Sequence, residues 1–268
     1  MLMFRAVRKS IRLAVIACLG FFFGQPATVF AAELGYYQWP AISGQQLVFA
    51  SEGDLWRASL EGGPASRLTT HREEETHPLF SPDGASLAFV ARYESAGDVY
   101  LMPTAGGKPQ RLTYEGGGVA PVAWFDNQHL LYVSSNAYAP GGQQLKRLDI
   151  TSGAIEVLPL ANANAATGAF GRGKANSDQT ELFFSRYGLS LSRDNAVHYR
   201  GGRVAQLWRW SEPKNRSKRA RLPEATRVLP DFAAPIRSPM WWQERVYFIS
   251  DASGSDNVWS VANNGGDA

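Results

Sequence analysis

Short runs of bulky apolar residues, separated by turn-forming residues, recur along this sequence. Residues 87–90 (Leu-Ala-Phe-Val) are continuously apolar, a pattern typical of a strand that is buried on both faces of a sheet. Residues 110–114 alternate polar and apolar positions instead, which predicts an outer strand with one exposed face. Residues 81–84 (Ser-Pro-Asp-Gly) combine a φ-restricted proline, an aspartate that can bond the backbone and a glycine that tolerates positive φ. The pattern therefore predicts many short strands joined by tight turns.

This strand pattern repeats along the chain, first at an interval of 44 residues. The first set is Asp-Leu-Trp at 54–56, Gly-Gly at 62–63 and Arg-Leu-Thr at 67–69, and the second is Asp-Val-Tyr at 98–100, Gly-Gly at 106–107 and Arg-Leu-Thr at 111–113. Looser copies have a strand at 130–133 and a hairpin at 148–153, strands at 182–184 and 206–208, and strands at 246–249 and 256–259. A repeat of this length with four strands per unit is typical of a β-propeller.

We therefore predict an all-β fold, a β-propeller over residues 32–268 with about five blades in this chain. A solenoid or a β-sandwich remains the alternative architecture. In the first two copies Arg-Leu-Thr follows the Gly-Gly pair, but after Gly265 and Gly266 only two residues remain. The last blade is therefore expected to be truncated before its outer strand, and the sequence is interpreted as a fragment of a longer protein.

The N-terminal segment, residues 1–31, differs in character from the rest. It has four basic residues and no acidic residue, then an apolar run at 13–23 and small residues before Ala32, a pattern typical of a cleaved secretory signal peptide. The apolar run is 11 residues long, shorter than the about 20 residues of a membrane span. A lipoprotein box ending at Cys18 is a less favoured alternative. A periplasmic or secreted protein without a stable membrane span is predicted.

Charge and cysteine content narrow the function classes. The formal charge of +3 and the pI of about 9.0 come from the N-terminal segment, because outside it 23 basic side chains face 24 acidic ones. The mature chain is thus near neutral, and a nucleic-acid partner is not expected. Cys18 is the only cysteine, so we expect no disulfide, no cysteine-based zinc site and no cysteine nucleophile after cleavage.

Motifs for catalysis are missing from this sequence. It has no Gly-x-Ser-x-Gly elbow of an α/β-type hydrolase, and Ser81 lies in a predicted turn. His71, His77, His129 and His198 show no His-Glu-x-x-His spacing. His77, which precedes a proline, is interpreted as a structural residue at a blade entrance. We therefore assign no catalytic, cofactor-binding or metal-binding residue, and we expect no cofactor.

Several other features receive structural interpretations. The three glutamates at 73–75 are predicted to form a solvated loop rather than a site for a cation or a peptide amine. Residues 251–256 resemble a calcium loop without its last glutamate and are predicted to form a hairpin turn. The basic insertion at 214–221 is interpreted as an exposed loop rather than a docking surface for acidic partners. Aromatic residues at strand positions are expected to pack between blades; they include Trp208, Trp210, Trp241 and Trp242.

Three stretches carry a resemblance to a known family. The turn at 81–84 and the strand after it resemble the Pro-Asp-rich, WD40-like repeat of TolB-type and tricorn-type propellers. Residues 198–202 (His-Tyr-Arg-Gly-Gly) and 238–242 (Ser-Pro-Met-Trp-Trp), with the strands that follow them, are similar to the N-terminal six-bladed propeller of tricorn-type serine peptidases. The resemblance spans essentially the whole mature chain.

The resemblance implies a large peptide-degrading enzyme with two propellers, a PDZ-like module and a C-terminal serine-peptidase core. It implies that the propellers gate the passage of peptides and take part in assembly. The expected partners are therefore peptides, the C-terminal peptidase domains and, through the full-length protein, further copies of the chain. The family's catalytic serine and histidine lie in its C-terminal part and match no residue here, so this chain alone is predicted to be inactive.

Two alternatives remain open at this stage. The first is a free-standing periplasmic interaction propeller similar to TolB. The second is the propeller cap of a prolyl-oligopeptidase-type enzyme, which requires a Gly-x-Ser-x-Gly domain downstream. The location is also open, because the cytoplasmic location usual for tricorn-type peptidases conflicts with the predicted signal peptide.

Overall fold

The structure, a computed structural model, describes residues 35–94, 96–135, 143–161, 163, 169–171, 179–186, 204–213, 224–262 and 265. The chain divides into two compact units, Met1–Gly35 and Tyr36–Ala268. The following description concerns the second unit. The predicted signal peptide and the basic insertion at 214–221 lie outside the described residues.

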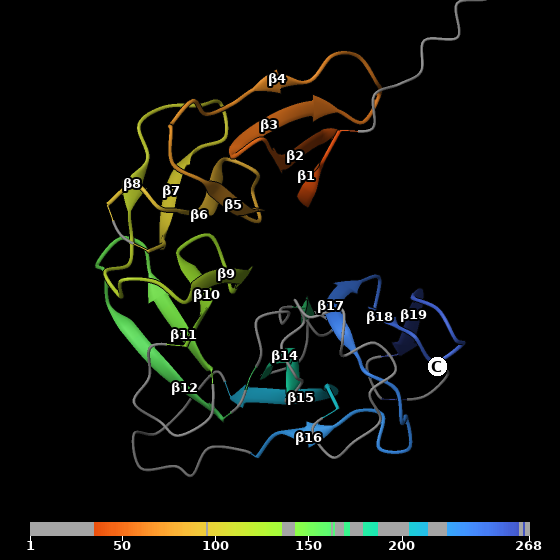
Figure 1. The fold of residues 1–268 in the computed structure, drawn as a ribbon. Helices are drawn as coiled ribbons and strands as arrows, with labels where there is room; N and C mark the ends of the chain where they lie inside the picture. Colours follow the sequence, from red (N-terminus) through yellow and green to blue (C-terminus); the bar gives the residue numbers. More distant parts are fainter. Residues whose placement is uncertain are drawn as a thin grey trace, which may run out of the picture. The chain divides into compact units, whose positions relative to one another are not determined.

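The described strands pair into five sheets, and in each sheet the strands lie side by side in chain order (Figure 1). Blade 1 contains β1 (Gln38–Ser43), β2 (Gln46–Ser51), β3 (Asp54–Ser59) and β4 (Ser66–Arg67). Blade 2 contains β5 (Glu75–Phe80), β6 (Ser86–Ala91), β7 (Asp98–Pro103) and β8 (Gln110–Arg111). Blade 3 contains β9 (Val119–Trp124), β10 (His129–Ser134), β11 (Gln144–Asp149) and β12 (Ile155–Ala161).

The two remaining sheets follow the same antiparallel plan. Blade 4 contains β13 (Ala169–Gly171), β14 (Gln179–Arg186), β15 (Gln206–Pro213) and β16 (Thr226–Arg227). Blade 5 contains β17 (Arg237–Trp242), β18 (Arg245–Ser250) and β19 (Asn257–Ala262), so within the described residues it has three strands. These sheets confirm the predicted all-β propeller with five blades in this chain.

The first strand of each blade lies on the inner side of the arrangement, and the later strands lie progressively farther out (Figure 1). β1 packs against β5, β5 against β9, β9 against β13 and β13 against β17. These five strands are termed the inner strands below.

The apolar core consists of layers between neighbouring blades. On β6, Leu87 and Phe89 pack in one layer with Leu55 of blade 1, whereas Ala88 packs in another layer with Tyr132 of blade 3. Successive side chains of a strand point to opposite faces. A continuously apolar strand therefore supplies both neighbouring layers, which confirms the interpretation of residues 87–90.

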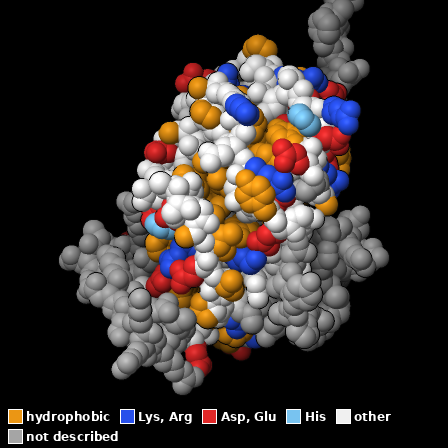
Figure 2. Space-filling view, turned by 90° about the vertical axis from the view of Figure 1, so that its left-hand side faces the viewer, with side chains coloured by type: hydrophobic (Ala, Val, Ile, Leu, Met, Phe, Trp, Pro, Cys, Tyr) orange, Lys and Arg blue, Asp and Glu red, His pale blue; other side chains and the backbone are white. Residues whose placement is uncertain are grey.

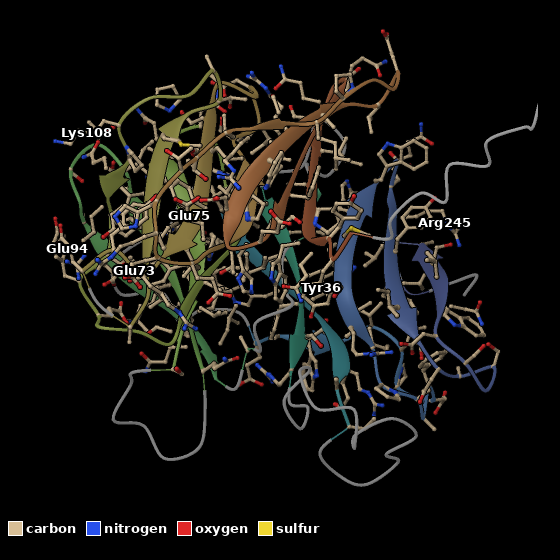
Figure 3. The ribbon with its side chains drawn as sticks, turned by 45° about the horizontal axis from the view of Figure 1, so that its top comes forward. Tyr36, Glu73, Glu75, Glu94, Lys108 and Arg245 are labelled. Atoms are coloured by element: carbon tan, nitrogen blue, oxygen red, sulfur yellow. The ribbon has the colours of Figure 1, made fainter. Side chains whose placement is uncertain are left out.

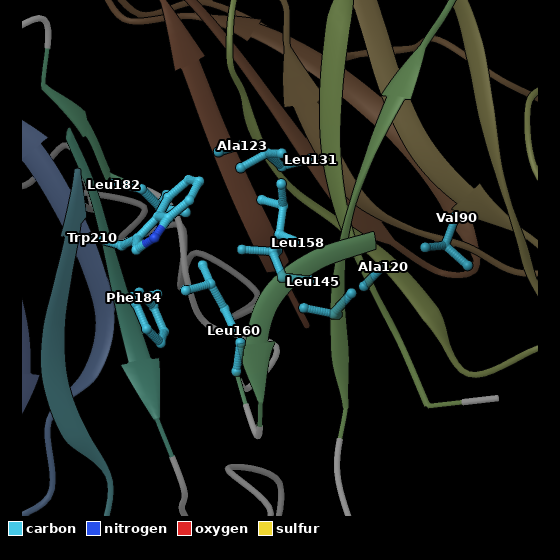
Figure 4. Packing of buried hydrophobic residues seen from close by; sticks show 12 residues of the cluster. Val90, Ala120, Ala123, Leu131, Leu145, Leu158, Leu160, Leu182, Phe184 and Trp210 are labelled. Atoms are coloured by element: carbon cyan, nitrogen blue, oxygen red, sulfur yellow. The ribbon is translucent and has the colours of Figure 1, made fainter. Parts of the chain in front are cut away.

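The layer between blades 3 and 4 combines aliphatic and aromatic side chains (Figure 4). Leucines of blade 3 meet an indole and a phenyl ring of blade 4; the labelled members include Leu131, Leu145, Leu158, Leu182, Phe184 and Trp210. Burying a side chain of this size contributes about 1.5–3 kcal/mol to folding.

The predicted turn at residues 81–84 is present between β5 and β6. The Gly84 N–H donates to the Ser81 carbonyl (2.8 Å). The Asp83 carboxylate accepts from the Ser81 hydroxyl (2.6 Å) and from the Ala85 N–H (3.0 Å). Gly84 has a φ of 71°, and a Cβ there would lie 2.8 Å from the Ser43 hydroxyl oxygen. Each residue type of the motif therefore meets a distinct requirement of the turn.

The outer strand of blade 2 is shorter than predicted. The alternating residues 110–114 form a strand only at Gln110–Arg111. The N–H groups of Leu112 and Thr113 both donate to the Val99 carbonyl (2.8 and 3.4 Å), and the Val99 N–H donates to the Thr113 hydroxyl oxygen (2.9 Å). The chain therefore leaves the regular ladder after Arg111.

The predicted hairpin turn at 251–256 joins β18 to β19. The Gly254 N–H donates to the Asp251 carbonyl (2.9 Å), and Ser250 pairs with Asn257 across the turn. Its interpretation as a turn is confirmed.

Charges on the surface are mixed. In the face that Figure 2 shows, acidic and basic side chains alternate over short distances, with hydrophobic side chains between them. A membrane-spanning helix is not found in the part of the chain that the structure describes.

Candidate functional site

Three inner strands share a backbone irregularity at a residue that precedes proline. Trp39 on β1, His77 on β5 and Ser238 on β17 have φ angles of 53°, 53° and 47°. At each of them the pairing with the second strand shifts register. For residues other than glycine this left-handed conformation costs about 1–3 kcal/mol and is concentrated at functional sites. We therefore take these bulges as the first candidate for a functional surface.

Trp39 and His77 lie against each other across the boundary between blades 1 and 2. Their rings stack with a centroid distance of 3.7 Å and an interplanar angle of 26°. Trp39 is 44% exposed, so part of the indole remains accessible. The His77 Nδ1 lies 2.9 Å from the Thr76 hydroxyl oxygen. Burial lowers the pKa of His77 to about 4, which keeps its imidazole neutral at physiological pH.

The inner strands carry little charge around this stack. In β1, β5, β9 and β17 the acidic and basic residues are Glu75 and Arg237. Arg237 is paired with the Asp256 carboxylate. Glu75 has no exposed surface. The accessible side chains of these four strands are therefore almost entirely uncharged.

Glu75 corrects the prediction of a solvated acidic loop. Its neighbour Glu74 is exposed, but Glu75 is fully buried at the start of β5, inside the propeller (Figure 3). Its carboxylate accepts from the Leu55 N–H (3.3 Å) and from the hydroxyls of Thr69 and Tyr93. Desolvation raises the pKa of this carboxyl, although the hydrogen bonds act in the opposite direction. Glu75 thus links blade 1 to blade 2.

Glu115 has a comparable place between blades 2 and 3. Its backbone N–H donates to the Asp98 carboxylate of blade 2 (3.0 Å). Its own carboxylate accepts from the Tyr132 hydroxyl (2.7 Å), the Lys146 amine (2.8 Å) and the Ser134 hydroxyl, all in blade 3. Burial alone would raise the pKa of Glu115, but the hydrogen bonds from Lys146, Ser134 and Tyr132 outweigh it and lower the pKa.

The repeated Arg-Leu-Thr sequences pair with the repeated aspartates. In blade 2 the Asp98 carboxylate accepts from Arg111 (2.6 Å) and from the Thr113 hydroxyl (2.8 Å). In blade 1 Arg67 lies 3.3 Å from Asp54, but the Thr69 hydroxyl donates to Glu75. The repeat of 44 residues therefore encodes an ion pair that locks the outer strand to β3 or β7, which the sequence interpretation did not identify.

The serine and the described histidines that the sequence offers as candidates for chemistry occupy different places in the fold. Ser81 is buried and bonds within its turn, His71 is exposed, and the His129 Nδ1 lies 2.9 Å from the Asp126 carboxylate. In the described ranges, no three metal-ligating acids, histidines or cysteines gather at one place. His198 lies outside them.

The tryptophans divide into buried and exposed groups. Trp210 is 2% exposed, Trp208 packs against the same layer, and Trp241 stacks on Phe183 with a centroid distance of 5.4 Å. Packing between blades is thus confirmed for these three. It is wrong for Trp242, which is 59% exposed: successive side chains of a strand point to opposite faces, and Trp241 is the one that faces the layer with blade 4.

The architecture and this surface define the class of protein. It is a β-propeller whose described blades have three or four strands, with few charged residues on the inner strands and polar links between blades. Residues 34–268 match the family described as the tricorn protease N-terminal β-propeller domain, and the chain belongs to that family.

Curated relatives and solved structures agree with this assignment. The chain is 31% identical to a putative tricorn protease homolog 2 of Streptomyces coelicolor, over 87% of this chain and 19% of that protein. It is 28% identical to tricorn protease homolog 1 of the same organism, over 88% of this chain and 21% of that protein. The chain thus spans about a fifth of the length of these relatives. A putative tricorn-like protease N-terminal subunit of Sulfurisphaera tokodaii is 26% identical over 47% of this chain and 67% of its own length.

The solved structures establish the fold. The crystal structure of the tricorn protease matches 87% of this chain and 22% of its own length, with a TM-score of 0.69 and 20% identity. A putative TolB from Agrobacterium tumefaciens matches 87% of this chain and 79% of its own length, with a TM-score of 0.66 and 22% identity. Both similarities concern the propeller architecture.

Proposed function

We propose that this chain is the propeller part of a tricorn-like serine peptidase, and that it gates the passage of peptides to or from catalytic domains elsewhere in that protein. The observation that carries the proposal is the family match over residues 34–268, together with relatives of which this part makes up about a fifth. The inner strands are the surface that peptides would meet. The outer faces would supply the contacts for assembly.

The inner strands suit transient contact with peptides. Their accessible side chains are mostly uncharged, so an unfolded segment would meet few groups that hold it by strong ion pairs. The hydroxyl of Ser81 is engaged by Asp83, and no described histidine is bonded to it. Bond cleavage is therefore assigned to the catalytic domains rather than to this propeller.

The second candidate is a free-standing interaction propeller. A TolB homolog of Chlorobium chlorochromatii is 35% identical over 120 residues, which are 43% of this chain and 26% of that protein. Such a module would bind a folded protein partner at one end of the propeller. Its contacts would therefore lie at that end rather than along the inner strands.

A peptide assay separates these possibilities. Purified chain is mixed with unstructured, fluorescein-labelled decapeptides, and anisotropy and cleavage are followed in the same sample. We expect saturable binding without hydrolysis. Turnover that persists after Ser81→Ala and after repurification would place a reaction centre in this chain. An absence of binding by every peptide would contradict the gating role and favour the free-standing module.

The proposed location, periplasmic or secreted, rests on residues 1–31. Expression of the full chain in a bacterium, followed by N-terminal sequencing of the periplasmic fraction, tests it. A mature product that begins at Ala32 is expected. A full-length product retained in the cytoplasm would contradict the proposal.

A further inference from the structure

We propose that the stacked Trp39–His77 pair is a platform for uncharged, planar side chains, aromatic or prolyl, of peptides that move along the inner strands. The inference rests on the proposed function and names the class of peptide side chain that this surface prefers. It assigns a binding role to two residues that neither catalysis nor the core requires.

The geometry of the pair favours stacking of a further ring. His77 covers one part of the indole at 3.7 Å, and the indole remains 44% exposed. Both residues lie at backbone bulges with φ angles of 53° and directly before prolines. A bulge reorients a side chain relative to its strand. The two bulges on neighbouring blades are what bring the rings together.

Burial does not explain why a tryptophan occupies position 39. The corresponding bulge of blade 5 has Ser238 there, and it is exposed. The fold therefore accepts a small polar residue at such a bulge. The part of the indole that His77 leaves exposed keeps apolar surface in water, which is unfavourable unless a bound group covers it.

The charges around the pair set its preference. Burial keeps the His77 imidazole neutral, and Glu75, the acidic residue of β5, points into the boundary between the blades, where it bonds Thr69 and Tyr93. Arg237 on β17 is paired with Asp256. A lysine side chain on the indole could gain a cation–π contact but no ion pair, and it would lose hydration. An aromatic or prolyl ring loses no such hydration and gains the stacking contact.

The experiment compares peptides and variants in the anisotropy assay. Four unstructured decapeptides of the same glycine-serine background have phenylalanine, proline, lysine or glutamate at three central positions. Wild-type chain should bind the phenylalanine and proline peptides about two- to tenfold more tightly than the lysine and glutamate peptides, the range that an aromatic contact provides. Trp39→Ala should remove this preference, and Trp39→Phe should retain most of it.

Tyr114→Ala is the matched control, because Tyr114 is an exposed aromatic residue outside the inner strands, with 76% exposure. It should leave the preference unchanged. Thermal unfolding of each variant confirms its fold, and the wild-type peptide series decides the question even if Trp39→Ala does not fold. Equal affinity for all four peptides, or tighter binding of the lysine peptide, would overturn the platform but not the gating role. Binding of no peptide would instead contradict the proposed function itself.

Discussion

Two carboxylates hold consecutive boundaries of this propeller, the fully buried Glu75 and the partly buried Glu115, and they differ in one partner. Both accept a phenolic and an aliphatic hydroxyl; the donors are Tyr93 and Thr69 for Glu75, and Tyr132 and Ser134 for Glu115. At the second boundary Lys146 adds an ammonium group (2.8 Å). At the first boundary no cation is bonded to Glu75 in the described contacts, and the added donor is the Leu55 N–H (3.3 Å).

This difference in partners shifts the pKa values of the two carboxyls in opposite directions. Desolvation dominates at Glu75 and raises its pKa, whereas Lys146 and the two hydroxyls lower the pKa of Glu115 despite its partial burial. The comparison teaches that the same scaffold of hydroxyl donors can hold either a carboxyl that resists ionisation or one that favours it. The choice depends on whether the next strand supplies a cation.

The largest effect is expected from Glu115→Ala. The substitution leaves the Lys146 amine, 15% exposed, without its carboxylate. Breaking this partly buried ion pair, together with the loss of the acceptor of two hydroxyls, costs about 2–3 kcal/mol of unfolding free energy. Urea unfolding followed by tryptophan fluorescence measures it. Glu156→Ala is the control, since Glu156 is exposed and Arg147 keeps Glu212 (2.8 Å); it should cost less than about 1 kcal/mol. Similar losses for both variants would contradict a special role for Glu115.

Glu75→Ala should have the next largest effect. It removes the acceptor of two hydroxyls in a site with no exposed surface, which costs about 2 kcal/mol. Glu75→Gln keeps one carbonyl acceptor and avoids burying a charge, so it should cost about 1 kcal/mol or less. The exposed neighbour provides the control, Glu74→Ala, with a change within about 0.5 kcal/mol. A glutamine variant as unstable as the alanine variant would show that the charge is needed.

The repeated ion pairs should follow with smaller effects. Arg111 is 18% exposed and bonds an Asp98 side chain with no exposed surface (2.6 Å), whereas Arg67 is 43% exposed and lies 3.3 Å from Asp54. We expect Arg111→Ala to cost about 1–2 kcal/mol and Arg67→Ala less than about 1 kcal/mol. The urea concentrations at the midpoints of unfolding, taken at equal m-values, compare the stability losses of the two variants. A larger loss of stability for Arg67→Ala than for Arg111→Ala would show that burial and distance of the ion pair do not determine its contribution to stability.

The pH dependence should be the smallest effect and should have opposite signs at the two boundaries. The folded pKa of Glu75 is above its ordinary value of 4.5, so its contribution to stability is complete below 4.5 and is lost as the pH rises through the folded pKa. The folded pKa of Glu115 is below 4.5, so its contribution is complete above 4.5 and is lost as the pH falls through the folded pKa. The variants are Glu75→Gln and Glu115→Gln. For each, the difference in unfolding free energy from wild type is measured from about pH 3 to about pH 8, and its slope with pH should have opposite signs for the two variants. Parallel slopes would refute the assignment of either carboxyl.

Much of the fold follows from local signals in the sequence. The turn at 81–84 is determined by consecutive proline, aspartate and glycine residues, and the turn at 251–256 by an aspartate and a glycine; both form as predicted. The continuous apolar strand at 87–90 likewise indicates burial on both faces, because it has no polar position to expose. The shorter outer strand at 110–111 does not follow, since it depends on how Thr113 bonds Val99 across the blade.

The carboxylate contacts between blades and the bulges of the inner strands are harder to predict from the sequence. Glu75 belongs to an acidic run, and only the fold brings Thr69 and Tyr93 to its carboxylate. The prolines after Trp39, His77 and Ser238 did give a signal, which an alignment of the repeats on their inner strands would have revealed. The positive φ angles and the ring stacking depend on register shifts that residue patterns do not encode.

The central claim is that peptides pass along the inner strands. Locating the contact between a bound peptide and the propeller tests it most directly. A bimane label is placed on Ser238→Cys of the inner strand β17 or on Ser152→Cys of the exposed turn between β11 and β12, each in a chain with Cys18→Ser. A peptide that contains tryptophan quenches bimane on contact. Saturable quenching at position 238 and none at position 152 is the predicted result. Quenching at 152 with none at 238, while anisotropy reports binding, would contradict the passage of peptides along the inner strands.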